Sequence, residues 1–439
     1  MSPRSTRREA LALLGSVAVA GCLDDGGGAA RSDDPAGGTT EPPTEPAPTG
    51  RGPTPSSASK PWAERIAVES GPGTASTAVD PPGSDAWPSV KRDAGATARA
   101  PSDASPDPPL ARRTLATTEQ ASMLTPAIGA DAAVCLTGHP DAVLRGIDPA
   151  TGKRRWGRTR DDLGHASPAL ADGTAFVPWG YYKRAEHVTA VDATTGEQRW
   201  EVDVAEAPAC APVATGGTVY AGTDGTALVT ALDAGSGRRC VTFALPAPTT
   251  AVRRIAVADG RLYAGTLGFA SDVPDVGHVL AADPAAGTVA WSVETGRPVA
   301  DLAVSGGTAY VAAGDRTLAL DAATGTERWR REAAGRIGAV AVADGTVYLG
   351  SDAGVRALAA GDGSDRWRSG PAAGSGLAVS GGTVYAGGPN GLAVLDADGG
   401  RVRWRDDGPT VAGGPALAGG LAYLGTADGR LVGYGPGES

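Results

Sequence analysis

Histidine side chains are the residues of this sequence best suited to acid–base or metal chemistry, because imidazole titrates near neutral pH and ligates metals. There are four of them, His139, His165, His187 and His278. The first three could be combined into a metal site, but no spacing typical of metal ligands supports it. We therefore predict no metal site, no catalytic residue and no bound cofactor.

Aspartates recur at one position of a repeated phrase and are the next candidates for chemistry. The phrase reads GIDPATGKRRW at 146–156, AVDATTGEQRW at 190–200 and ALDAATGTERW at 319–329. Its carboxylate can accept hydrogen bonds from backbone amides within a turn, and its glycine can supply the left-handed residue. We interpret these aspartates as turn residues rather than as acids or bases: Asp148, Asp192, Asp233, Asp283, Asp321 and Asp396.

A tryptophan stands eight residues after the turn position in six copies of the phrase. These are Trp156, Trp200, Trp291, Trp329, Trp367 and Trp404, while Val241 takes the place in the third copy. Repeating units that pack face to face need a side chain of the same size at the equivalent position of each contact. We predict that each tryptophan docks on the next unit, where its absence would leave a cavity costing about 3–5 kcal/mol.

A second repeated phrase predicts the strands that position these residues. One copy is LAVSGGTVYAG at 377–387. Eight copies pair two short apolar runs, and all but the degenerate first copy, TPAIGADAAVCL at 125–136, do so around Asp-Gly or Gly-Gly, the preferred two-residue hairpin turn. Together the phrases give four strands per unit, here named A to D, with a period near 40 residues that is typical of propeller blades. We predict an all-β fold: an eight-bladed β-propeller of four-stranded antiparallel blades.

Ring closure requires one more strand than the C-terminal region supplies. Eight A–B hairpins are followed by seven D strands before the chain ends at Ser439. Counting back from the first hairpin places Leu115, within ARRTLATT, in the tryptophan position of the eighth blade. We therefore expect an N-terminal strand to pair with the last blade and remove its exposed edge.

Charge and composition limit the classes of partner. The 439 residues carry a net charge of −10, which argues against nucleic acid, whose phosphates require a basic face. Four lysines stand against 35 arginines, a bias that fits salt adaptation, a GC-rich genome or both. We expect a monomer that binds a protein or another component of the cell envelope.

The first residues resemble an export signal. Arg7 and Arg8 precede an apolar run from Ala10 to Ala20, too short to span a bilayer, and VAGC ends at Cys22. This pattern predicts a twin-arginine, lipobox signal over 1–22 with Cys22 lipidated, and hence a protein anchored to the cell membrane on its extracellular side. Residues 23–85 are rich in Gly, Pro, Ser and Thr and predict a disordered tether, followed by a lead-in at 86–108 and the propeller at 109–435.

Departures from the repeat are the natural place for recognition. Insertions at 137–145, 178–187 and 266–278 all fall between strands B and C, so all three are expected on one face, here called the B–C face. Arg253 and Arg254 are expected at its edge. The candidate recognition residues are His139, His165, Trp179, Tyr181, Tyr182, His187, Phe269 and His278. The tryptophan, the two tyrosines and the phenylalanine among them are expected to be exposed. The alternative stays open that these are simply polar and aromatic residues that loops accept.

The repeated DxxTGxxxW motif, as in 192–200 and 321–329, resembles the tryptophan-docking motif of PQQ-like (pyrroloquinoline-quinone repeat) β-propellers. AWPSVKRDAGATARAP at 86–101 is also similar to the lead-in of halophilic-archaeal members, which read W-P-x-x-x-x-D-x-x-x-T. The resemblance covers residues 86–435. It implies the propeller fold and either a catalytically silent BamB-type lipoprotein or a quinone-dependent dehydrogenase.

The same resemblance favours the catalytically silent lipoprotein over the dehydrogenase. Quinoprotein dehydrogenases share a vicinal Cys-Cys pair, a Ca²⁺-binding set of carboxylates and amides, and a catalytic Asp, whereas this sequence has no Cys-Cys. Strand A of the blades reads as Ala, Val, Leu, Gly and Ser, which also favours a non-catalytic scaffold. A PQQ-dependent dehydrogenase-like enzyme and a sensor ectodomain remain the alternatives. Blade geometry keeps Cys135, Cys210 and Cys240 apart, so we expect three free thiols.

Overall fold

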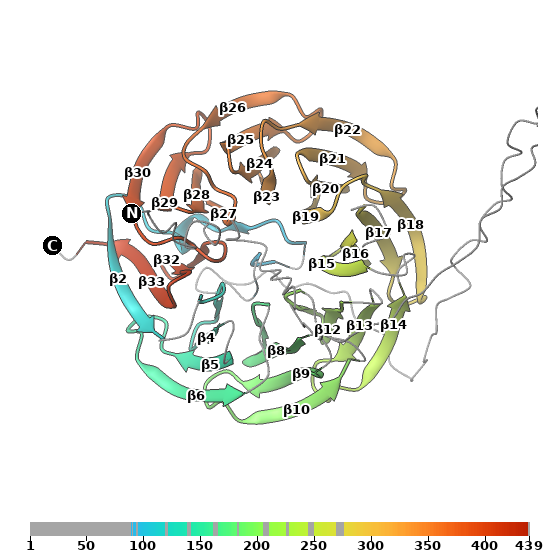
Figure 1. Cartoon of the computed structure of the whole chain (residues 1–439), viewed down its shortest axis with the longest axis vertical. Helices are drawn as coiled ribbons and strands as arrows, with labels where there is room; N and C mark the ends of the chain where they lie inside the picture. Colours follow the sequence, from blue (N-terminus) through green and yellow to red (C-terminus); the bar gives the residue numbers. More distant parts are fainter. Residues whose placement is uncertain are drawn as a thin grey trace, which may run out of the picture.

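The computed structural model describes most of the chain after its first 88 residues. The described residues are 89, 91–93, 95–118, 122–137, 142–160, 166–181, 184–204, 210–224, 228–244, 250–268 and 276–437. Eight sheets are arranged as blades around a central axis, with strand A innermost and strand D at the rim (Figure 1). The predicted all-β, eight-bladed propeller is confirmed. Among the described residues no helix is long and apolar enough to cross a bilayer.

Blades 1 to 4 follow one another along the chain. Blade 1 comprises β3 (Ala127–Ile128), β4 (Ala133–Leu136), β5 (Ala142–Ile147) and β6 (Arg154–Arg160). Blade 2 comprises β7 (Ala169–Ala171), β8 (Thr174–Tyr181), β9 (Arg184–Asp192) and β10 (Gln198–Asp203). Blade 3 comprises β11 (Val213–Thr215), β12 (Thr218–Gly222), β13 (Leu228–Asp233) and β14 (Arg239–Ala244). Blade 4 comprises β15 (Thr250–Ala258), β16 (Arg261–Gly268), β17 (His278–Asp283) and β18 (Thr288–Glu294).

Blades 5 to 8 complete the ring. Blade 5 comprises β19 (Val299–Ser305), β20 (Thr308–Ala313), β21 (Arg316–Asp321) and β22 (Glu327–Glu332). Blade 6 comprises β23 (Ile337–Ala343), β24 (Thr346–Ser351), β25 (Gly354–Ala359) and β26 (Asp365–Ser369). Blade 7 comprises β27 (Gly376–Ser380), β28 (Thr383–Gly388), β29 (Gly391–Asp396) and β30 (Val402–Asp407). Blade 8 comprises β31 (Ala416–Ala418), β32 (Leu421–Gly425), β33 (Arg430–Pro436) and the N-terminal β2 (Leu110–Thr117).

The A–B hairpins turn where the sequence places Asp-Gly or Gly-Gly. In blade 6, Asp344 and Gly345 both have positive φ, +47° and +69°. This pair of left-handed residues matches the twist of the flanking strands, which is why the turn selects Asp and Gly. The inner strands on either side are almost entirely buried, so the core runs between blades around the whole ring.

Closure by the N-terminal strand is also confirmed. β2 runs antiparallel to β33, with Leu110 opposite Pro436 and Thr117 opposite Arg430. Leu115 stands at a bulge in this pairing and is buried. It lies against Gly152 of blade 1, where a Cβ would come within 2.5 Å of the Leu115 carbonyl oxygen. The strand therefore joins both ends of the chain into one continuous ring.

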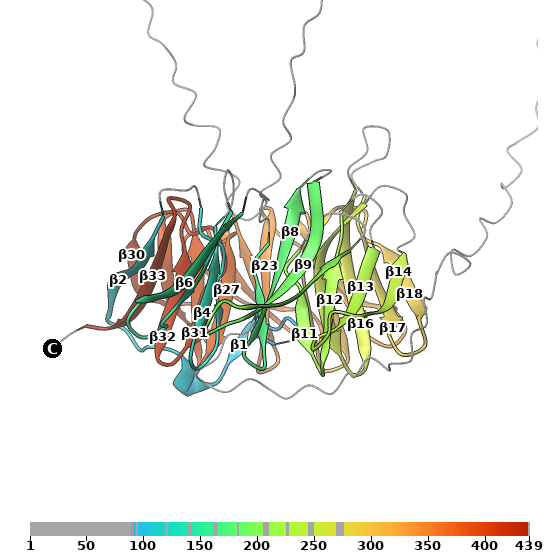
Figure 2. The ribbon, with the colours of Figure 1, turned by 90° about the horizontal axis from the view of Figure 1, so that it is seen from below.

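The lead-in enters the centre of the ring from one face. Backbone amides of the inner strands, at Val304, Val342 and Val379, donate to the carbonyls of Gly95, Thr97 and Ala98 at 2.8–2.9 Å. β1 (Arg99–Ala100) then pairs in parallel with β27, and a short 3₁₀ helix, η2 (Ser102–Ala104), follows. Figure 2 shows this segment at the lower face, opposite the projecting β8–β9 hairpin. The lead-in thus occupies the mouth of the channel on the side of the A–B turns.

Candidate functional site

The structure describes only some of the side chains that the sequence places at the B–C face. His139, His165, Tyr182 and Phe269 lie outside the described residues. Tyr181 ends β8, and His278 begins β17, where it is half-buried. Burial lowers the pKa of His278, although Glu294 opposes this effect.

The exposure expected for Trp179 is wrong. Only 2% of Trp179 and 3% of His187 is accessible. The insertion at 178–187 is largely a longer hairpin rather than a loop, since β8 continues to Tyr181 and β9 begins at Arg184. Trp179 and His187 face each other in its register, and Arg160 of blade 1 lies over the Trp179 ring at 5.2 Å from its centroid. The neighbouring blade therefore covers the indole that the sequence places in a loop.

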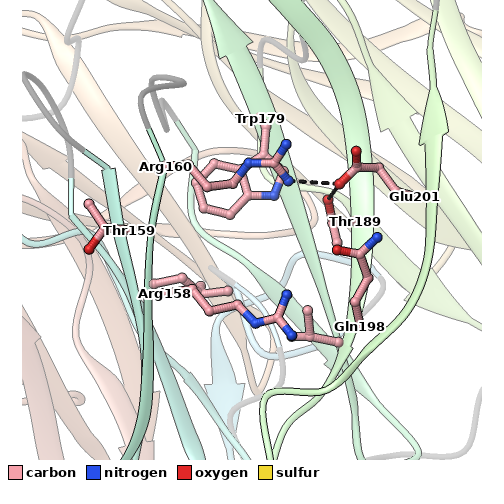
Figure 3. A pocket seen from close by; sticks show the side chains of 9 residues that line it. Arg158, Thr159, Arg160, Trp179, Thr189, Gln198 and Glu201 are labelled. Carbon is pink, nitrogen blue, oxygen red and sulfur yellow. Dashed lines mark hydrogen bonds and ion pairs between the residues drawn. The ribbon is translucent and has the colours of Figure 1, made fainter.

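A groove of about 440 Å³ opens between blades 1 and 2 beside this hairpin (Figure 3). Leu144 and Val191 supply apolar lining. The other lining residues are Arg158, Thr159 and Arg160 of β6, Trp179 of β8, Thr189 of β9, and Gln198 and Glu201 of β10. In the close view, the two arginines reach across from β6 towards the residues of blade 2. The groove therefore has both polar and apolar lining and is bounded by the edge strand β6.

Glu201 organises one end of this groove. Its Oε2 accepts hydrogen bonds from Arg160 Nη1 at 2.7 Å and from Thr189 Oγ1 at 2.9 Å (Figure 3), and His187 Nε2 lies 3.6 Å from the same oxygen. Burial favours a higher pKa for Glu201, but the hydrogen bonds from Arg160 and Thr189 outweigh it and hold the pKa below its ordinary value. The carboxylate is therefore ionised and fixes Arg160 in its position over Trp179.

The repeat tryptophans lie between neighbouring blades. In five of them Nε1 donates to the carbonyl of the residue that follows the turn position in the next blade, at 2.8–3.0 Å: Trp156 to Ala193, Trp200 to Ala234, Trp291 to Ala322, Trp329 to Ala360 and Trp367 to Ala397. Trp404 instead meets Tyr434 edge-on, with ring centroids 5.7 Å apart. Each indole thus links two blades by packing, and five of them add a directed hydrogen bond.

The repeat aspartates hold their own turns. In blade 5, Asp321 Oδ1 accepts from the amides of Ala323 and Thr324, and Oδ2 accepts from Arg328 at 2.8 Å. These hydrogen bonds, led by that of Arg328, lower the Asp321 pKa to about 2. The pKa values of Asp148 and Asp192 are lowered to about 2 in the same way, chiefly by backbone hydrogen bonds from the turn. Carboxylates held so firmly ionised are suited to fixing a turn, not to accepting a proton at neutral pH.

One buried carboxylate lies in the channel where the sequence pattern of inner strands predicts only small and apolar residues. Asp301 of β19 is 1% exposed and accepts from Lys91 Nζ at 2.6 Å and Arg254 Nε at 3.0 Å. The amides of Leu302 and Val340 donate to it as well. Burial alone favours a raised pKa for Asp301, but the two cations outweigh it and lower the pKa. The sequence contains only four lysines, and one of them is Lys91. Its rarity was the signal that could have drawn attention to this site.

The surroundings of Asp301 do not fit the Ca²⁺ that the resemblance implies for dehydrogenases. Both oxygens of Asp301 already have a cationic and an amide donor, so neither is available to a metal ion. Lys91 belongs to the lead-in, whose backbone carbonyls accept hydrogen bonds from the inner strands of blades 5 to 7. In the part of the chain that the structure describes, no three His, Cys, Asp or Glu side chains gather as a metal site.

The three cysteines of the propeller are free, in agreement with the sequence-based expectation. Cys135 and Cys210 are buried, and Cys240 is half-buried. Burial raises the pKa of Cys135 to about 12 and that of Cys210 to about 11, so both are thiols at neutral pH and poor nucleophiles. Arg7, Arg8 and Cys22 lie outside the described residues.

Comparisons of sequence and of structure relate this chain to several known proteins. A curated relative, the serine/threonine-protein kinase AfsK of Streptomyces griseus, is 29% identical over 199 residues, which are 42% of this chain and 23% of the kinase. The chain thus spans about a quarter of that relative. BamB from Moraxella catarrhalis superposes with a TM-score of 0.58 at 18% identity, over 75% of this chain and 99% of that one. The quinohemoprotein alcohol dehydrogenase from Comamonas testosteroni gives 0.62 at 16% identity, over 82% of each chain.

A protein-family model described as outer membrane protein assembly factor BamB matches residues 140–268, 184–298, 275–368 and 351–436. These overlapping matches run from blade 1 to the end of blade 8 and cover more than half of the chain. Because these two solved structures are less than 25% identical to this chain, they show the fold alone. The family match shows that this chain belongs to the BamB-type family of PQQ-like β-propellers.

Proposed function

We propose that this protein is a membrane-anchored, extracytoplasmic scaffold that binds a protein partner and catalyses no reaction. The observation that carries the proposal is the opposite placement of two features. The lead-in enters the ring at the A–B turns, and the long β8–β9 hairpin projects at the other face (Figure 2). A partner bound at the B–C face therefore does not compete with the chain segment that leads to the proposed anchor.

The irregular elements support the same proposal. β8 and β9 have eight and nine residues, whereas the corresponding strands of blade 5 have six each. Blades 5 to 7 keep the regular repeat. The insertions at 137–145, 178–187 and 266–278 therefore belong to blades 1 to 4 only. Arginine and tryptophan at the base of the β8–β9 hairpin are the residue types that dominate binding energy at protein interfaces.

The anchoring part of the proposal rests on Arg7, Arg8 and Cys22. We expect Cys22→Ala to move the protein from the membrane fraction to the soluble fraction while leaving its folded part unchanged. A Cys22→Ala protein that still sediments with membranes, at high salt and at the level of the unaltered chain, would contradict a lipid anchor.

Photo-crosslinking tests the binding function. A photoreactive amino acid at position 181, on the projecting hairpin, is compared with one at position 405, on the rim of blade 7, in cells grown under native conditions. We expect a discrete protein adduct from position 181 and none from position 405. Equal adducts from both positions, or none from either position together with no partner recovered by affinity capture from detergent-solubilised membranes, would overturn the proposal.

A further inference from the structure

The D strand of blade 1 carries an unusual charge for this protein. β6 reads RRWGRTR, with four arginines and no acidic residue, in a chain of net charge −10. The corresponding strands of blades 5 to 7 mix arginine with Asp or Glu. β6 pairs with β5 on one side, and no strand among the described residues pairs with its other edge at the rim. A basic, unpaired edge strand therefore borders the groove between blades 1 and 2.

Two of the four arginines are already neutralised. Arg155 pairs with Asp148 at 3.0 Å, and Arg160 pairs with Glu201 at 2.7 Å. Within the described part of the chain, neither Arg154 nor Arg158 forms an ion pair. Arg158 lines the groove and is exposed, which leaves a guanidinium with its bidentate donors available to a carboxylate.

A buried donor in the same groove also has no acceptor. Trp179 lines the groove and is 98% buried, yet its Nε1–H donates to no atom within the described residues. The five docking tryptophans of the repeat each satisfy this donor with a backbone carbonyl. An unsatisfied buried N–H is destabilising, so an acceptor brought by a ligand would gain energy at this point.

We propose that the groove between blades 1 and 2 binds an extended, acidic segment of the partner protein. The segment adds along the open edge of β6, one of its carboxylates meets Arg158, and an oxygen of the segment accepts from Trp179 Nε1–H. Addition of a strand to a free edge supplies main-chain hydrogen bonds, while alternate side chains enter the groove. This assignment rests on the proposed function and names the chemistry of its partner.

A synthetic probe tests the assignment with the full-length protein. The probe is a seven-residue peptide of alternating Glu and Thr, blocked at both ends, and its control has Gln in place of Glu. We expect the Glu peptide to bind in calorimetry, to weaken with rising salt, and to bind at least about tenfold more tightly than the Gln peptide, the equivalent of about 1.4 kcal/mol. Absence of binding, or equal binding of the two peptides, overturns the proposal.

Three variants locate the binding. Arg158→Glu is expected to weaken the Glu peptide at least tenfold, and Trp179→Phe, which keeps a ring but removes the donor, about threefold or more. Arg405→Glu makes the same change of net charge on an exposed strand of blade 7 and is expected to leave affinity within twofold. Unchanged thermal unfolding shows that each variant is folded. Equal losses for Arg158→Glu and Arg405→Glu would mean a general charge effect and overturn the site.

The groove and the scaffold function fail in distinguishable ways. Crosslinking from position 181 is repeated with Arg158→Glu in the full chain. A partner that crosslinks equally well to this variant refutes the groove and leaves the scaffold function standing. A loss of the adduct with Arg158→Glu, but not with Arg405→Glu, supports both.

Discussion

Removing the charge of Asp301 should destabilise the propeller far more than removing that of Lys91. Asp301 contacts two cations, with Oδ2 2.6 Å from Lys91 Nζ and Oδ1 3.0 Å from Arg254 Nε. With an effective dielectric constant of about 20, each contact is worth about 5.5–6.5 kcal/mol of gross attraction, most of which desolvation offsets. Asp301→Asn loses both attractions and leaves the buried Lys91 and the partly buried Arg254 uncompensated. We therefore expect it to lower the free energy of unfolding by about 3–5 kcal/mol.

Lys91→Met loses only one of these contacts. Asp301 keeps Arg254 and the amides of Leu302 and Val340, so its charge remains compensated. The expected loss is about 1.5–3 kcal/mol, the value for a hydrogen bond to a charged group. The double variant should cost less than the sum of the single ones by at least about 1 kcal/mol, because the two side chains are in direct contact.

The assay is equilibrium unfolding in guanidinium chloride, followed by tryptophan fluorescence and by circular dichroism. Coincidence of the two transitions is required before free energies are compared. Asp344→Asn is the matched control. The Arg99–Asp344 ion pair also joins the lead-in to a blade, in this case blade 6, but both of its side chains are exposed. This substitution should change stability by no more than about 0.5 kcal/mol. Additive single and double variants, or a cost of Asp301→Asn no larger than that of Asp344→Asn, would refute the reasoning.

Four further outcomes are expected. Trp329→Ala should cost about 3–5 kcal/mol in the same unfolding assay, since it opens a cavity between blades 5 and 6 and leaves the Ala360 carbonyl with only the longer hydrogen bond from Tyr310 Oη. Asp192 has a folded pKa of about 2, so its contribution is present above pH 3.8 and is lost as the pH falls towards 2; Asp192→Asn should weaken the pH dependence of thermal unfolding in this window. Thiol titration of the Cys22→Ala protein in denaturant should count three thiols with or without reductant, whereas one before reduction would indicate a disulfide. Dye-linked assays with added PQQ and Ca²⁺ should show no oxidation of alcohols or aldoses, and PQQ-dependent turnover would contradict a non-catalytic role.

Much of the fold follows from local sequence because each blade repeats the same local code. Asp-Gly and Gly-Gly tolerate the two left-handed residues of a hairpin turn, and few other pairs do. The spacing of the repeated aspartates and tryptophans then sets the number of blades and the partner face of each indole. Even the closing strand around Leu115 could be placed from the count of D strands.

The candidate site was only partly accessible to this reasoning. The sequence located the unusual hairpin at 178–187 but placed Trp179 in an exposed loop, because its cover is Arg160, 19 positions earlier and in another blade. Asp301 was missed for a related reason. Its partners come from the lead-in and from blade 4, and no local pattern connects positions 91, 254 and 301.

The amino-acid sequence by itself determined the strands, the turns, the number of blades and the residues between blades, since these depend on interactions that recur at a fixed interval along the chain. Only the tertiary structure decided which charges are buried together, which end of the channel the lead-in fills and where a groove opens. Those features depend on single side chains from distant segments, and a repeat carries no information about the places where it is broken.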